Sequence, residues 1–293
     1  MELQYHVVDV FTTTPLQGNA LAVFPDASAL DGATMQRLAR EMNLSETTFV
    51  LPKESSADSI RTRIFTPASE LPFAGHPTIG TAYVMRRIGI VSGDAKAFAL
   101  QENVGRVPVR VDEGEDPILW LTTPPIRKLG EFGRDRCAKA LSLGPGRLLP
   151  SVPCEMLSAG NPNLFIALRD RQAVDDARVD DRELSDLLRP CKSPTCVFVF
   201  APTSSGAYSR MFAPELGVVE DPATGSATGP LAVFMMKHGL VPATDGTRFV
   251  SEQGVKMGRR SVLHVLIRGE RGSEGIEVGG NVVHVAEGTV RLP

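Results

Sequence analysis

The stretch that decides the fold is "ELPFAGHPTIGTAYVMRRIG", residues 70–89. Prolines, glycines and a histidine crowd its first part, and a helix-like run follows that ends at Gly89, a residue suited to the left-handed position after a helix. The pattern predicts a helix over residues 76–88 that begins at His76. Because a helix N-terminus carries unpaired N–H groups and a partial positive charge, we expect an anion site at this point.

A second copy of the pattern lies 150 residues downstream. The stretch "GSATGPLAVFMMKHG" (225–239) is identical to "GHPTIGTAYVMRRIG" (75–89) at five of fifteen positions. Other matches keep the same order along the chain, with "RIFTP" resembling "RMFAP" and "QGNALAVF" resembling "AGNPNLFIAL". We interpret the chain as two homologous halves, each with strands, a Pro- and Gly-rich turn and a helix.

The alternation of apolar and polar residues predicts many strands and few helices. Helices are expected at 33–43, 76–88 and 226–238, and the last of these is apolar nearly all round, which predicts burial. The fold class expected is α+β, with each half a β-barrel-like sheet wrapped round one central helix. Strands are predicted in "YHVVDVF", "TTFVLP", "RTRIFT", "VPVRVD", "PILWLT", "CVFVFAP", "VLHVLIRG" and "NVVHVAEGTVRL".

The polar stretch "VDEGEDP" near the middle of the chain predicts the boundary between the halves. The N-terminal half is expected to span residues 1–114, completed by a C-terminal strand at 280–293. The C-terminal half is expected to span 115–279.

Composition excludes several classes of function. Hydrophobic residues make up 42% and charged residues 22% of 293 residues, with a net charge of -3, so neither a nucleic-acid nor a membrane partner is expected. The apolar runs are too short to span a bilayer, and no signal-peptide pattern precedes the first strand. The four cysteines form no C-x-x-C pair, which is typical of reduced thiols in a cytoplasmic protein.

Two related halves usually face each other, and ligands favour the crevice between them. The two helix starts would then converge on one small anionic substrate, held by Gly75, Gly225 and Ser226. His76 stands at the first start, Asp221 precedes the second, and Glu46 begins an apolar strand. A histidine and carboxylates in one cleft suit proton transfer, and a buried glutamate with a raised pKa can act as acid and base.

Each of these residues also has a purely structural interpretation. His76 and Ser226 could cap their helices, Asp221 could shape the turn before Pro222, and Glu46 could be a solvated charge at a strand end. Turn chemistry explains the two asparagines that follow glycines, and no role is assigned to the remaining histidines: Asn19 and Asn161, and His6, His238, His264 and His284.

Four stretches together resemble the PhzF-like phenazine-biosynthesis family, which has the diaminopimelate-epimerase-like fold. These stretches are "VVDVFTTTPLQGNALAVF", "MQRLAREMNLSETTFVL", "RIFTPASELPFAGHPTIGTA" and "EDPATGSATGPLA". The resemblance implies two similar halves with the site in the cleft between them. It also implies an isomerase that moves a proton along an allylic system, as in the isomerisation of trans-2,3-dihydro-3-hydroxyanthranilate.

By the same resemblance the catalytic residues are Glu46, His76 and Asp221, with Ser226 beside them, and neither a cofactor nor a metal is expected. Homodimers are usual in the family. Epimerases and racemases of this fold use two thiols at the helix starts, whereas this chain has Ala74 and Thr224 there, which argues against two-thiol racemisation. Two alternatives stay open: an epimerase-like or lyase-like enzyme acting on another small hydroxy or amino acid, and a non-catalytic metabolite-binding protein.

Overall fold

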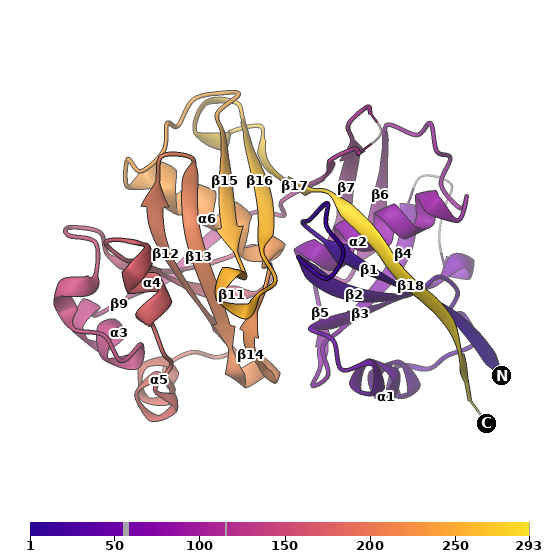
Figure 1. Ribbon diagram of the computed structural model, residues 1–293, viewed down its shortest axis with the longest axis horizontal. Coiled ribbons are helices and arrows are strands. Elements are labelled where there is room, and N and C mark those ends of the chain that lie inside the picture. The colour runs from indigo at the N-terminus through magenta and orange to yellow at the C-terminus, as the bar shows by residue number, and fades with distance from the viewer. Residues whose placement is uncertain (55–58, 115, 293) are drawn as a thin grey trace.

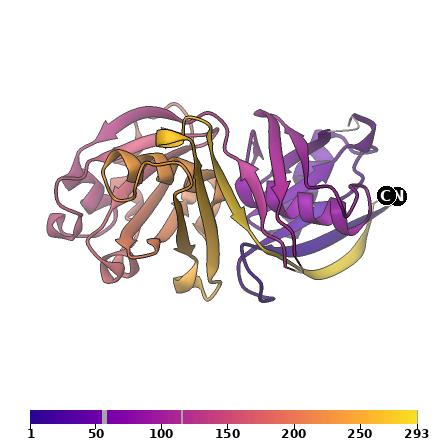
Figure 2. The same cartoon turned by 90° about the horizontal axis from the view of Figure 1, so that it is seen from above.

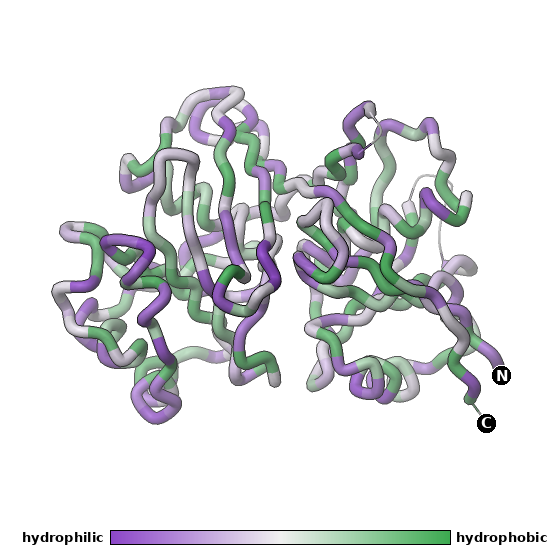
Figure 3. Tube along the Cα trace, viewed as in Figure 1, coloured by the Kyte–Doolittle hydropathy of each residue, from purple (hydrophilic) through white to green (hydrophobic). Residues whose placement is uncertain are grey.

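The computed structural model describes residues 1–54, 59–114 and 116–292. The chain forms two lobes side by side, each with strands wrapped round one helix (Figures 1 and 2). In Figure 3 hydrophobic residues follow the strands, while hydrophilic residues collect in loops and on the outer helices. The α+β class and the two similar halves predicted from the sequence are confirmed.

The first lobe contains the strands that precede and follow the histidine-bearing helix. Its elements are β1 (Glu2–Val10), β2 (Asn19–Phe24), α1 (Gly32–Met42), β3 (Glu46–Val50), β4 (Ser59–Phe65), β5 (Glu70–Leu71), α2 (Gly75–Arg87), β6 (Ala97–Glu102), β7 (Gly105–Val111) and β8 (Leu119–Thr122).

The second lobe repeats this order with two extra helices on its outer side. Its elements are β9 (Arg127–Phe132), α3 (Arg134–Ala140), β10 (Cys154–Ser158), β11 (Pro162–Ala167), α4 (Arg171–Asp176), α5 (Asp181–Leu188), β12 (Cys196–Thr203), β13 (Gly206–Ala213), β14 (Val218–Asp221), α6 (Gly225–Lys237), β15 (Arg248–Gln253), β16 (Ser261–Arg268) and β17 (Gly275–Gly280). The chain ends in β18 (Val282–Arg291).

Strand pairing is the same in both lobes. In the first lobe β2 runs parallel to β3, β3 is antiparallel to β4, and β4 is parallel to β6. In the second lobe β11, β12, β13 and β15 pair in the same succession and with the same directions. The matching topology is what a repeat 150 residues apart predicts, with α2 and α6 as equivalent helices.

The last strand belongs to the first lobe by its pairing. β18 is antiparallel to β1, as β9 is antiparallel to β10 in the second lobe. β8 links the lobes, because Leu121 pairs with Val109 of β7 on one side and with Val278 of β17 on the other. The domain division between residues 114 and 115 stays a prediction. Residues 115 and 293, at the edges of the predicted segments, lie outside the described residues.

Both central helices are buried because their residues are small or apolar on every side. Ten residues of α2 and ten of α6 are buried, including Ile79 and Met85 in α2 and Leu231 and Phe234 in α6. Both helices begin one residue before the predicted start. Gly89 and Gly239, with φ of 79° and 66°, follow the helix ends in the left-handed region, as predicted.

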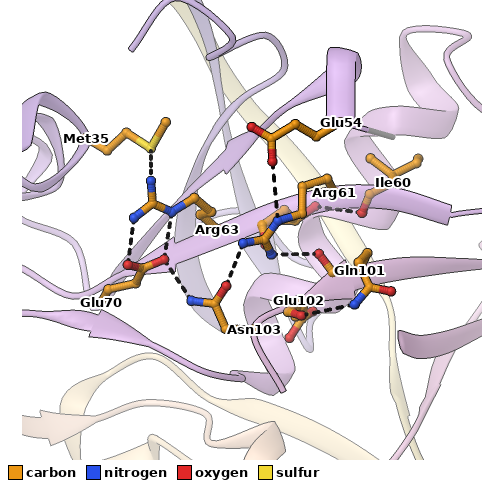
Figure 4. A network of polar contacts seen from close by, with 10 residues as sticks. Met35, Glu54, Ile60, Arg61, Arg63, Glu70, Gln101, Glu102 and Asn103 are labelled. Atoms are coloured by element: carbon orange, nitrogen blue, oxygen red, sulfur yellow. Dashed lines mark hydrogen bonds and ion pairs between the residues drawn. The ribbon is translucent and has the colours of Figure 1, made fainter. Parts of the chain in front are cut away.

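A polar network fixes the hairpin that leads into α2 (Figure 4). The Arg63 guanidinium donates to both carboxylate oxygens of Glu70 at 2.8 and 2.7 Å, and Asn103 Nδ2 donates to Glu70 Oε1 at 2.9 Å. This bidentate pair holds β5 against β4. The loop from residue 72 to 74 therefore starts from a fixed point, and that loop carries the chain to the start of α2.

Candidate active site

The two helix starts meet at the junction of the lobes. A Cβ atom added to Gly75 would lie 2.5 Å from Gly225 Cα and 2.6 Å from Ser226 N, so only glycine allows the backbones to approach this closely. Neither helix has a side-chain hydrogen bond at its N-cap, which is Ala74 in α2 and Thr224 in α6. Two partial positive charges are thus concentrated in one place.

Glu46 and His76 lie next to each other at this junction. Glu46 begins β3, His76 is the second residue of α2, and Glu46 Oε2 lies 3.3 Å from His76 Nε2. Their side chains are only 13% and 3% exposed, and neither of these two atoms has a hydrogen-bond partner within the described residues. Capping does not explain His76, and solvation does not explain Glu46.

Burial favours the uncharged form of both side chains. Loss of water raises the pKa of Glu46 well above 4.5, and the charge of Asp221 raises it further. Loss of water also lowers the pKa of His76 from 6.5 to about 3. Burial therefore disfavours an ion pair between the two side chains, although the distance alone would permit one. A carboxyl group with a raised pKa can both give and accept a proton near neutral pH.

Asn19 determines which nitrogen of His76 carries the proton. The Asn19 amide Nδ2 donates to Asp221 Oδ1 at 2.7 Å and to the Ala223 carbonyl oxygen at 3.0 Å, and lies 3.1 Å from His76 Nδ1. The two hydrogens of this amide face three atoms, so one hydrogen is shared. Since an amide nitrogen cannot accept, His76 Nδ1 is an acceptor of the shared hydrogen. The proton of the neutral ring is then on Nε2, the atom that faces Glu46.

Asp221 is held at the end of β14, just before the second helix start. Its Oδ2 accepts from Thr224 Oγ1 at 2.6 Å, and Gln253 Nε2 donates to its backbone carbonyl oxygen at 2.7 Å. Burial raises the pKa of Asp221 to about 6, against the hydrogen bonds from Thr224, Asn19 and Ser45 that lower it. Asp221 is therefore mostly ionised at pH 7, in a position that a turn-shaping role alone does not explain.

Ser226 lies inside the first turn of α6 and is buried, and the N-cap is Thr224. The interpretation of Ser226 as the capping residue is therefore wrong. Its place beside the Gly75 backbone puts it at the junction of the helix starts. The structure thus brings together all six residues singled out from the sequence: Glu46, Gly75, His76, Asp221, Gly225 and Ser226.

Sequence reasoning missed Asn19, which it had explained by turn chemistry. The missed signal was its repetition. Asn19 donates across the junction to Ala223, just before α6, and Asn161 donates across it to the Phe73 carbonyl oxygen at 2.7 Å, just before α2. The repeat offset of 150 relates Phe73 to Ala223. Each lobe therefore uses its Gly-Asn turn to hold the helix start of the other lobe.

This pair of asparagines gives a matched test. We expect Asn19→Ala to lower kcat by about 10- to 100-fold, because a hydrogen bond to a charged group is worth about 1.5–3 kcal/mol. Asn161→Ala removes the equivalent lobe contact without touching a carboxylate, and should lower kcat only a few-fold at a similar loss of stability. Turnover and thermal unfolding of both variants check this. Equal losses of kcat in the two would assign Asn19 a structural role only.

The residues at this junction are not grouped as metal ligands would be. Within the described residues, the one group of three side chains with metal-ligand spacing is His6, His284 and Glu287, on β1 and β18.

None of the described helices combines the length and apolar character needed to cross a membrane.

Fold and site define a class: an α+β protein of two similar lobes with acid–base residues at their junction. The sequence matches the family described as phenazine biosynthesis-like protein over residues 8–288. It is 39% identical over 292 residues to the trans-2,3-dihydro-3-hydroxyanthranilate isomerase of Pseudomonas aeruginosa, covering 99% of each chain. The chain belongs to this family, and it is an isomerase.

Solved structures agree with the fold. A predicted epimerase from Pseudomonas aeruginosa has a TM-score of 0.85 and 32% identity, covering 99% of this chain and 100% of that one. A phenazine biosynthesis protein of the PhzF family from Bacillus anthracis has a TM-score of 0.88 at 23% identity, with full coverage of both chains. The latter likeness concerns the fold alone.

Proposed function

We propose that this isomerase moves a proton within a small, conjugated carboxylate substrate related to trans-2,3-dihydro-3-hydroxyanthranilate. The observation that carries the proposal is the buried Glu46–His76 pair beside Asp221 at two convergent helix starts. The isomerase from Pseudomonas aeruginosa that is 39% identical to this chain acts on that compound, as its name states.

Glu46 is the proposed acid and base. In its ionised form it takes a proton from an sp³ carbon, and the C–H electron pair moves into the conjugated system of the substrate. The same carboxyl group returns a proton to another carbon of that system, so the formula of the substrate does not change. His76 Nε2–H faces Glu46 Oε2 and stabilises the carboxylate whenever it forms.

The helix starts are the proposed site for the negative charge. The backbone N–H groups of Gly75, Gly225 and Ser226 lie in the first turns of their helices, where they have no acceptor within the helix. They would hold the substrate carboxylate and the charge that develops on deprotonation. Asp221 would accept a hydrogen bond from an amino or hydroxyl group of the substrate. We expect no cofactor for this chemistry, because proton transfer needs only these groups.

Thiol chemistry is not favoured, even though one cysteine lies close by. Cys196 begins β12 as Glu46 begins β3, and burial together with the charges of Asp221 and Glu46 raises its pKa to about 12. A thiol with this pKa is protonated at pH 7 and is a poor base. The homodimer and the cytoplasmic location expected from the sequence stay predictions.

The proposal is tested by NMR in D₂O with trans-2,3-dihydro-3-hydroxyanthranilate. We expect conversion to the isomer with deuterium at a ring carbon. The matched control is the same amino-hydroxy diene without its carboxyl group, which should react far more slowly because the helix starts would have no anion to hold. If the parent compound neither isomerises nor exchanges a C–H proton, the proposed substrate class is wrong.

A further inference from the structure

Two histidines and a glutamate meet on the outer side of the first lobe, away from the helix starts. His6 of β1 and His284 of β18 lie with Nδ1 and Nε2 3.3 Å apart. Glu287 Oε2 lies 3.6 Å from His6 Nδ1 and 3.7 Å from His284 Nε2. The three atoms form a nearly equilateral triangle, although His6 and His284 are 278 positions apart in the chain.

A β-bulge brings these side chains to one face. Residues three apart in a regular strand point to opposite faces, so His284 and Glu287 would normally diverge. In the β1–β18 ladder Val7 pairs with Ala286 but Val8 pairs with His284, which leaves Val285 as an extra residue. The bulge rotates the strand so that His284 joins Glu287, and Glu287 pairs directly with His6.

The size of the triangle matches one face of a tetrahedral metal site. Zinc bound at about 2.0–2.2 Å from nitrogen or oxygen separates its tetrahedral ligands by about 3.3–3.6 Å. Octahedral Mg²⁺ at about 2.0–2.1 Å would require about 2.8–3.0 Å between neighbouring ligands. The observed edges of 3.3, 3.6 and 3.7 Å are closer to the zinc geometry. Imidazole nitrogen is also a ligand that Zn²⁺ prefers and Mg²⁺ does not.

Burial fixes the two imidazole rings in place. The side chains of His6 and His284 are only 11% and 16% exposed, so both rings are held against the sheet. Glu287 supplies the anionic ligand from a side chain that is 65% exposed.

We propose that His6, His284 and Glu287 bind one Zn²⁺ ion, with water as the fourth ligand. The ion would tie the last strand to the first strand, because two ligands come from β18 and one from β1. Since β18 completes the sheet around α2, the bound metal would stabilise the first lobe. This role is independent of the proposed proton transfer, whose residues lie elsewhere.

The site is tested with the tag-free, metal-free chain by titration with Zn²⁺ and with Co²⁺. We expect one ion per chain, a rise in the unfolding temperature that grows with Zn²⁺ concentration, and the intense visible absorption of tetrahedral Co²⁺. The Co²⁺ spectrum should lack a thiolate charge-transfer band, which separates this site from binding at the four cysteines.

Three variants decide the outcome. Glu287→Gln and His284→Gln should each weaken Zn²⁺ binding by at least about 10-fold. Removing a residue that only hydrogen-bonds to a metal ligand already weakens metal binding by about 10- to 100-fold. Glu2→Gln is the matched control, because Glu2 lies in the same ladder and its side chain is also 65% exposed. A dissociation constant weaker than about 1 mM, or equal affinity in all variants, would overturn the proposal. Glu287 is exposed, so the Glu287→Gln variant should fold normally. That variant alone can decide the test if His284→Gln misfolds.

Discussion

Replacing Glu46 with Gln is expected to lower kcat by about 10²- to 10⁴-fold, the contribution of a well-placed acid–base group. The amide has nearly the shape of the carboxylic acid, and burial raises the pKa of Glu46 and so favours its neutral form. Substrate binding should therefore survive, with KM changed only a few-fold. Single-turnover NMR in D₂O, together with calorimetric binding of the substrate, measures both quantities. Turnover within a few-fold of the wild-type rate would remove Glu46 from the mechanism.

Glu102→Gln is the matched control for this variant. Glu102 is also a buried carboxyl group, and burial raises its pKa to about 8 although Thr78 Oγ1 donates to it at 2.5 Å. When the pKa of a carboxyl group is higher in the folded than in the unfolded protein, the folded state loses stability as the pH rises from the unfolded-state pKa toward the folded-state pKa. Both variants should therefore gain stability relative to wild type as pH increases above about 4.5. Only Glu46→Gln should lose turnover, which separates the chemistry of Glu46 from its burial.

Replacing Gly75 with Ala is expected to disrupt the junction of the two lobes. The added Cβ would lie 2.5 Å from Gly225 Cα, and backbone cannot turn aside as the end of a side chain can. Overpacking of this kind costs about 1–3 kcal/mol, or more where nothing can relax. Misplacing the helix starts by about 1 Å should also lower kcat by about 10²-fold. Thermal unfolding and turnover measure the two effects.

Gly93→Ala serves as the comparison for Gly75→Ala. No described atom lies within 4 Å of a Cβ placed on Gly93, and its φ is not positive, so unfolding temperature and kcat should stay close to wild type. A Gly75→Ala variant with wild-type stability and turnover would show that the two helix starts need not touch in the working enzyme.

Most of the successful fold predictions came from local sequence patterns. The apolar character of 226–238 and the glycines after each helix placed α2 and α6 to within one residue, because both signals depend on neighbours in sequence. The repeat predicted the two lobes before their pairing was known. Asn19 was missed because its partners, Asp221 and Ala223, lie about 200 residues away, and a turn explained it equally well.

The sequence by itself determined the helices α1, α2 and α6, eight of the strands, the repeated halves and the residue types available for proton transfer, but not α3, α4 or α5. The tertiary structure decided their chemistry. The neutral forms of Glu46 and His76 are favoured because the fold removes both side chains from water, and the Asn19 amide that faces His76 Nδ1 places the ring proton on Nε2. A pKa depends on solvent and on charges within a few ångströms, and residues far apart in sequence supply both.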